Sequence, residues 1–248
     1  MLELLAVAAA GAAAGASNSI AGAGSLITFP TRVALGLAPL AANVTNTVGI
    51  VPGAVGGALG YTDLLREQGE RFARFLVPML LGAVAGTVAL LLTSDAAFEA
   101  IVPALIAASC LLLLFQPRLT ARLSHAGDER SPFLTAGIAF CGAYGAYFGS
   151  AVSILLFAIL ALFVADTLQH LNAIKILLVG CANLLAAVAY AFLGPVDWRY
   201  AVTIMVSSFA GGRVGAHYAR RIPSDPLRIS IAAVGLAVAV VLAIRALS

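Results

Sequence analysis

The sequence is poor in charged residues. Lys, Arg, Asp and Glu make up 10% of the chain, whereas hydrophobic residues make up 62%. A soluble domain carries about 25% charged residues, so this chain has too few to cover its apolar residues with water-facing groups. The shortage excludes an ordinary soluble domain and predicts that lipid is the solvent. The formal net charge of +3 is too small to indicate nucleic-acid binding, and we expect none.

The sequence also lacks motifs that pumps, metal centres and enzymes require. No GxxxxGK[ST] motif occurs, which argues against an ATP-driven pump acting on its own. The three histidines stand far apart and the three cysteines have no CxxC spacing, so no metal centre or redox motif is predicted. We therefore expect no cofactor, no metal and no enzymatic activity, since a membrane enzyme would need a paired acid and base within its spans.

Apolar runs divide the chain into helices. About 20 apolar residues are needed for one helix to cross a bilayer. Long helices are predicted at residues 2–20, 40–60, 72–93, 98–116, 170–193, 198–217 and 226–247. A short helix is predicted from Ser25, as its N-cap, to about Gly36. Two apolar runs complete the chain: one covers 133–148, and the other follows the break at Gly149-Ser150 and ends at about 164. The predicted fold class is an all-α membrane protein, a polytopic helical bundle.

Two glycine-containing segments interrupt these helices. Gly22-Ala-Gly24 breaks the first helix, and Gly149-Ser150 breaks the segment that opens the second half. A helix that begins inside the membrane leaves its first N–H groups unpaired, and its positive dipole end favours an anion. The two breaks are therefore predicted to form the walls of an anion site at the middle of the bilayer. The alternative is close helix packing without a ligand.

The chain also contains an internal repeat at an offset of 129 residues. Equivalent positions are Asn43 and Asn172, Tyr61 and Tyr190, Gly82 and Gly211, and Gly86 and Gly215. The predicted domains are a first transmembrane repeat at 1–116, a cytoplasmic connecting loop at 117–131 and a second transmembrane repeat at 132–248.

Arginines predict the orientation of the two halves. They cluster before the third span of the first half (Arg66, Arg71 and Arg74) but after the third span of the second half (Arg220 and Arg221). By the positive-inside rule the halves then have opposite orientation. We predict inverted repeats, each a broken-helix or re-entrant hairpin plus three transmembrane helices, with both termini outside. Eight simple crossings in two parallel repeats are the alternative.

Candidate binding residues lie at the breaks and at the polar starts of the spans that follow. They are Asn18, Gly22, Gly24, Ser25, Asn43, Thr45, Asn46, Tyr144, Tyr147, Gly149, Ser150, Ser153, Asn172 and Lys175. Lys175 is predicted to supply positive charge, because lipid does not solvate an ammonium within a span; snorkelling to an interface is the alternative. His170, near Asp166, is a candidate proton carrier, with a plain interfacial role as the alternative.

Motifs along nearly the whole chain resemble the sulfite exporter TauE/SafE family of membrane permeases. They are the glycine-broken segment 15–30, Ala42-Asn-Val-Thr45, Gly57-Ala-Leu-Gly-Tyr61, Tyr144-Gly-Ala-Tyr-Phe-Gly149, Leu171-Asn-Ala-Ile-Lys175, Asn183, Val196-Asp-Trp198 and the segment 211–221. The resemblance implies a multi-pass protein of the bacterial inner (plasma) membrane that handles sulfite, sulfonates or other sulfur-containing organic anions.

Together these observations predict a secondary transporter, a permease or exporter of a small sulfur-containing or organic anion, working by alternating access. The expected partners are a small anionic substrate, the lipid bilayer and protons as a candidate coupling ion. The sequence is also compatible with a homo-oligomer. An anion or small-solute channel is the alternative function, and a non-transporting partner subunit is a further one.

Overall fold

The computed structural model describes residues 2–20, 22–59, 61–63, 68–122, 128–218 and 224–247. These residues form helices and no strand, which confirms the predicted all-α class. The helices are α1 (Leu2–Ile20), α2 (Ser25–Ala34), α3 (Pro39–Ala58), α5 (Gly69–Leu92), α6 (Asp95–Arg122), α7 (Pro132–Tyr147), α8 (Val152–Phe163), α9 (Leu168–Leu193), α10 (Trp198–Tyr218) and α11 (Ser224–Leu247).

The bundle presents apolar surface that suits a lipid environment. Within the described residues, α5, α9 and the segment Asp95–Phe115 of α6 are long and apolar enough to cross a membrane. On α5 the side chains of Val77, Leu81, Val84 and Val88 are 48–66% exposed. A water-facing helix would carry polar residues at such positions, so this surface fits the multi-pass membrane protein that the composition predicts.

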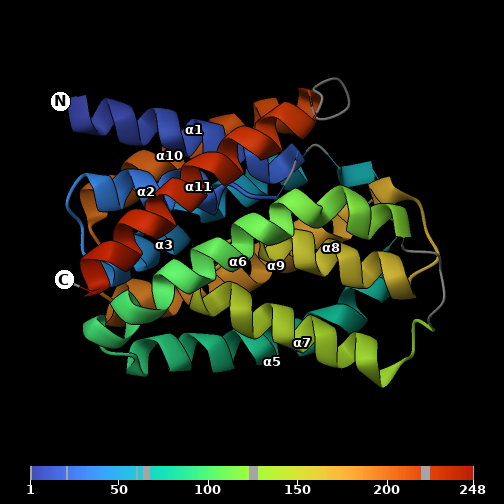
Figure 1. Ribbon diagram of the computed structural model, residues 1–248. Helices are drawn as coiled ribbons and strands as arrows, with labels where there is room; N and C mark the ends of the chain where they lie inside the picture. The colour runs from blue at the N-terminus through green and yellow to red at the C-terminus, as the bar shows by residue number, and fades with distance from the viewer. Residues whose placement is uncertain are drawn as a thin grey trace.

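Two pairs of helices double back on themselves (Figure 1). Leu4 and Val7, near the start of α1, belong to the same apolar cluster as Leu35 and Leu37, which follow α2. The segment α1–α2 therefore returns to the end of the bundle at which it began. The segment α7–α8 does the same at the opposite end, where α7 begins and α8 ends (Figure 1).

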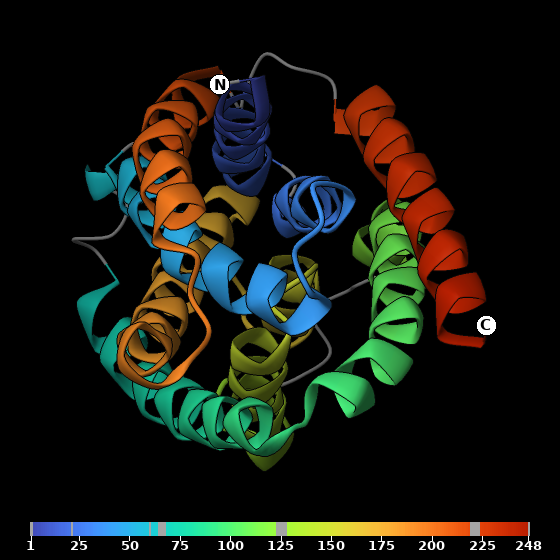
Figure 2. The same cartoon turned by 90° about the vertical axis from the view of Figure 1, so that its left-hand side faces the viewer.

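The six other helices run along the length of the bundle, and α1 begins at the end where α11 finishes (Figure 1). Seen from that end, α5, α6, α10 and α11 lie around the periphery and α2 lies toward the middle (Figure 2). The burial pattern agrees, because seven of the ten residues of α2 are buried.

Glycines bring α5 and α7 into close contact. A Cβ atom added to Gly82 would lie 1.9 Å from the carbonyl oxygen of Ala139, and one added to Gly86 would lie 2.0 Å from that of Ala143. No side chain fits in such a gap, so the two backbones touch. This is the small-residue packing that holds helices together where lipid provides no hydrophobic driving force.

A matching seam joins α1 to α10. A Cβ added to Gly211 would lie 2.0 Å from the carbonyl oxygen of Ala12, and one added to Gly215 would lie 2.5 Å from the Cα of Ala16. The glycines of the two seams are 129 residues apart (211 − 82 and 215 − 86), and the alanines are 127 apart (139 − 12 and 143 − 16). Equivalent residues therefore make equivalent contacts.

Several predicted boundaries need correction. Ser25 is the first residue of α2 and does not cap it; Gly24 is at the N-cap, and no side chain caps the helix there. The Ser25 hydroxyl instead accepts a hydrogen bond from Asn46. Arg71 and Arg74 lie within α5 rather than in a loop, because α5 begins at Gly69, and the predicted loop at 117–131 begins as helix because α6 continues to Arg122. Arg66, Arg220 and Arg221, used to predict orientation, lie outside the described residues.

Candidate functional site

The two helix breaks meet inside the bundle. Gly22 and Gly149 both have positive φ, +76° and +78°, a conformation that glycine adopts without strain. A Cβ added to Gly22 would lie 2.6 Å from the Cβ of Ser153, in the first turn of α8. Beside this contact, the rings of Phe29 on α2 and Phe148 after α7 meet edge to face with centroids 5.6 Å apart. The breaks therefore lie against each other, although about 127 residues separate them in the sequence.

Polar side chains hold the first break in place. Asn18, half-buried in the last turn of α1, accepts a hydrogen bond from the backbone N–H of Gly24 through Oδ1 at 2.7 Å. On α3, buried Asn46 donates to the Ser25 hydroxyl at 3.1 Å and accepts from the Thr28 hydroxyl at 2.5 Å. One amide thus bridges two hydroxyls on a single face of α2, and the Gly24 N–H is already occupied.

The second break is tied to both neighbouring helices. Asn43 Nδ2 donates to the carbonyl oxygen of Tyr147 at 2.9 Å, and Ser109 Oγ donates to that of Ser150 at 3.2 Å. Ala151 caps α8 with φ +59°, the left-handed conformation that costs a residue with a Cβ about 1–2 kcal/mol. This strain, which the sequence did not indicate, marks the turn as a point where the surrounding contacts dictate the backbone.

Lys175 is a buried cation on α9 next to α8, and it is the single lysine of the sequence. Its side chain lies on α9 and the residue is 4% exposed. Nζ donates to Asn172 Oδ1 at 2.6 Å and lies 5.7 Å from the centroid of the Phe157 ring, within the range of a cation–π contact. Asn172 in turn donates to the Tyr61 hydroxyl at 3.1 Å. Among the described residues no carboxylate pairs with Lys175.

Some candidate residues do not point toward the breaks. Thr45, fully buried on α3, accepts a hydrogen bond from the Asp197 N–H between α9 and α10 at 3.0 Å. Residues two apart on a helix do not share a face, so Thr45 cannot lie with Asn43. The Tyr147 hydroxyl bonds Thr93 after α5 at 3.2 Å, and only its backbone carbonyl lies at the break. The Tyr144 hydroxyl reaches the break indirectly, through Ser109 at 2.8 Å.

At the breaks and on α2 the structure leaves some buried polar atoms without hydrogen bonds, and of the residues that carry them the sequence had marked Ser150 as a candidate but not Ser17 or Arg32. Within the described part of the chain, the buried hydroxyls of Ser17 and Ser150 and the Nη1 and Nη2 atoms of Arg32 have no partner. Buried polar groups are nearly always paired, so unpaired ones at both breaks and on α2 call for an explanation. The signal for Arg32 was present, since an arginine inside an apolar span is a functional candidate by default.

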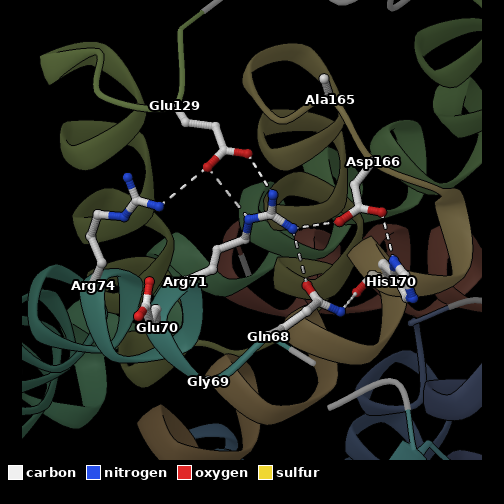
Figure 3. A pocket seen from close by; sticks show the side chains of 9 residues that line it. All are labelled: Gln68, Gly69, Glu70, Arg71, Arg74, Glu129, Ala165, Asp166 and His170. Carbon is white, nitrogen blue, oxygen red and sulfur yellow. Dashed lines mark hydrogen bonds and ion pairs between the residues drawn. The ribbon is translucent and has the colours of Figure 1, made fainter. Parts of the chain in front are cut away.

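A separate polar hollow of about 730 Å³ lies at the end of the bundle where α7 begins and α8 ends (Figure 3). Arg71 of α5 stands at its centre. Its guanidinium pairs with Glu129, before α7, at 2.7 Å, and with Asp166, after α8. One side chain therefore clasps both ends of the α7–α8 segment, and we call Arg71, Glu129 and Asp166 the Arg71 clamp.

Each carboxylate of the clamp has a second partner. Glu129 also pairs with Arg74 at 3.2 Å, and Asp166 Oδ1 lies 2.6 Å from His170 Nδ1 (Figure 3). Burial opposes the charge of Asp166, but hydrogen bonds from His170, the Thr167 N–H and Arg71 outweigh it and hold its pKa below the ordinary value. Asp166 is therefore a stable anion, and His170 lies beside it at the mouth of the hollow as the sequence suggested.

Comparison with known proteins identifies the family of this chain. Residues 7–242 match the family described as Sulfite exporter TauE/SafE. A probable membrane transporter protein of Haemophilus influenzae is 27% identical over 80% of this chain and 78% of its own length. A probable membrane transporter protein, ORF9, of a Sinorhizobium species is 27% identical over 92% and 87%, and the probable membrane transporter protein YfcA of Escherichia coli K12 is 24% identical over 82% and 76%. The family match covers nearly the whole chain, including both helix breaks, and the chain belongs to the TauE/SafE family of membrane transporters.

Proposed function

We propose that this protein is a secondary transporter that moves a small sulfur-containing or organic anion, such as sulfite or a sulfonate, across the bacterial inner membrane. The family description supports the class of substrate, and the names of the relatives support transport across a membrane. The mechanism we propose is alternating access around a site at the two helix breaks.

The observation that carries the proposal is the meeting of two broken helices in a bundle that also buries a cation without a carboxylate partner among the described residues. Gly22 lies against Ser153, the Ser17 and Ser150 hydroxyls lack partners, and Lys175 has no carboxylate within the described residues. An anion at the breaks would accept hydrogen bonds from the hydroxyls, and an anion that moved along α8 would neutralise the ammonium. Without a ligand these groups would remain buried and unsatisfied, which is costly.

We further propose that the chain consists of two inverted repeats, 1–116 and 132–248, joined at 117–131. The α1–α2 and α7–α8 segments double back from opposite ends of the bundle (Figure 1), and the matched glycine seams support equivalence of the halves. In such an arrangement the same site can be reached from either end when the halves exchange conformations.

Coupling to protons is part of the proposal. Asp166 and His170 lie 2.6 Å apart at the hollow, and we propose that this pair carries the coupling proton. The Arg71 clamp holds both ends of the α7–α8 segment, so a change in charge at this cluster would alter how firmly that end of the transporter stays closed.

Reconstitution into liposomes tests the proposal. We expect purified protein to accumulate radiolabelled sulfite or methanesulfonate against a concentration gradient when a pH gradient is imposed. Lys175→Met should bind and move these anions at least about tenfold more weakly, since a charge-assisted hydrogen bond contributes about 1.5–3 kcal/mol. Flux that only ever runs downhill would favour a channel, and liposomes that move none of these anions would favour a non-transporting subunit.

A further inference from the structure

We propose that Arg32 is a second anion-binding residue, placed on the opposite side of the helix breaks from Lys175, and that it selects oxyanions through a two-point contact. The inference rests on the proposed transport of an anion and deepens it, because it names the chemical group of the substrate that is recognised.

Arg32 is the most deeply buried charge in the described part of the chain, with 0% of its surface exposed. Its Nε atom donates to the carbonyl oxygen of Thr28 at 3.1 Å, within its own helix. Nη1 and Nη2 have no partner within the described residues. The side chain is thus held by one nitrogen while its other two stay free to donate.

Arg32 lies on α2, the helix that begins at the first break and contacts the second break through Phe29. It lies seven residues after Ser25, on the α2 face that also carries Thr28 and contacts Asn46. Phe29, three residues before Arg32, touches Phe148 at the second break. At about 1.5 Å per residue, Arg32 is about 10 Å along α2 from the first break.

Lys175, on α9, lies beside α8 at a position comparable to that of Arg32 on α2. It lies beside Phe157, which is five residues after Val152 and therefore about 8 Å along α8 from the second break. Because α2 and α8 leave the breaks toward opposite ends of the bundle (Figure 1), the two buried cations stand on either side of the breaks. An anion that passes the breaks would leave one cation and meet the other.

A purely structural role does not account for Arg32. A buried charge without a partner is strongly unfavourable, and an apolar residue of similar size would pack at lower cost. Glu99 lines a hollow beside Val33 and Leu37, but it is exposed and makes no contact that would satisfy Arg32. Because no carboxylate among the described residues satisfies Arg32, we assign that role to a ligand.

The two free nitrogens define what that ligand presents. A guanidinium offers parallel N–H groups in a rigid plane, which match two oxygen atoms on one central atom. Sulfite, sulfonates and carboxylates have such a pair of oxygens, whereas a halide has a single acceptor centre. Arg32 therefore favours oxyanions over halides in a way that the point charge of Lys175 cannot.

The test compares Arg32→Lys and Arg32→Met with wild-type protein and with Arg213→Lys, a change at an exposed arginine on α10. Binding of sulfite, methanesulfonate and chloride to purified protein is measured by calorimetry and by the shift in melting temperature. We expect Arg32→Lys to weaken oxyanion binding about 10- to 100-fold and to change chloride binding less, while Arg213→Lys behaves as wild type.

Arg32→Met covers the case in which the Arg32→Lys substitution perturbs the fold. Because it removes a buried charge without a partner among the described residues, its ligand-free melting temperature should equal or exceed that of the wild-type protein. Sulfite should raise the melting temperature of this variant less than it raises that of the wild-type protein. Wild-type oxyanion affinity and transport in both variants would overturn the role of Arg32 while leaving the proposed function standing. Wild-type protein that neither binds nor moves any oxyanion would overturn both.

Discussion

Replacing Arg71 by glutamine should loosen the end of the bundle where α7 begins and α8 ends. The change removes both ion pairs of the Arg71 clamp, in which the side chains of Arg71, Glu129 and Asp166 are 21%, 26% and 16% exposed. Glu129 keeps Arg74 as a partner and Asp166 keeps His170. Exposed ion pairs contribute up to about 1 kcal/mol each to stability, and the two pairs of the clamp are half-buried. We therefore expect the free energy of opening this end of the bundle to fall by about 1–2 kcal/mol.

Hydrogen–deuterium exchange of the segments 128–134 and 163–171 measures this loss directly. A loss of this size raises the population of the locally opened state about 5- to 30-fold, and amide exchange in both segments should accelerate by that factor. Arg74→Gln is the matched control, because Arg74 is 46% exposed and makes a single pair at 3.2 Å; we expect about a twofold change or less. Equal exchange in the two variants, or acceleration in one segment alone, would refute the reasoning that one arginine clasps both ends.

Three further predictions address the breaks and the clamp. Lys175→Met should abolish uphill sulfite accumulation without lowering the ligand-free melting temperature, because it removes a buried ammonium that lacks a carboxylate; undiminished accumulation would exclude Lys175 from the site. Gly22→Ala should lower the free energy of unfolding by about 2–5 kcal/mol, because the new Cβ causes both left-handed backbone strain and a clash with α8. Gly36→Ala is the control, since Gly36 has φ +93° but nothing within 4 Å of the added Cβ, and it should show the strain alone. Similar melting temperatures for the two variants would contradict the contact between the breaks. Asp166→Asn in the otherwise wild-type protein should lower the melting temperature at pH 5 at least as much as at pH 8. A lowered pKa keeps the carboxylate's contribution to stability fully present above about 3.9, and that contribution is lost only as pH falls through the folded value. A difference that shrinks between pH 8 and pH 5 would contradict the lowered pKa.

Local features of the fold were predictable from the sequence because they depend on neighbouring residues. The breaks at Gly22 and Gly149 were correctly placed, since positive φ is a property of glycine itself. Apart from α6, which continues to Arg122, the predicted helices begin and end within a few residues of the observed ones, because apolar runs and Pro/Gly boundaries set their limits.

What the sequence could not provide is the direction of side chains and contacts between distant segments. Ser25 resembles an N-cap by sequence, but Asn46 of α3 engages its hydroxyl instead. Thr45 has the same polar character as its neighbours but faces the α9–α10 connection. The partners of Arg71 are 58 and 95 residues away, and no local pattern predicts such pairs.

The glycine seams determine which helices can move together. Backbones in contact along two turns have no room to slide, because every glycine sits directly against a carbonyl or Cα of its neighbour. A conformational change must therefore carry α5 with α7 and α1 with α10. The rigid bodies of such a cycle would each combine a helix from the first half of the sequence with one from the second half, so neither half of the chain expressed alone would contain a complete moving part.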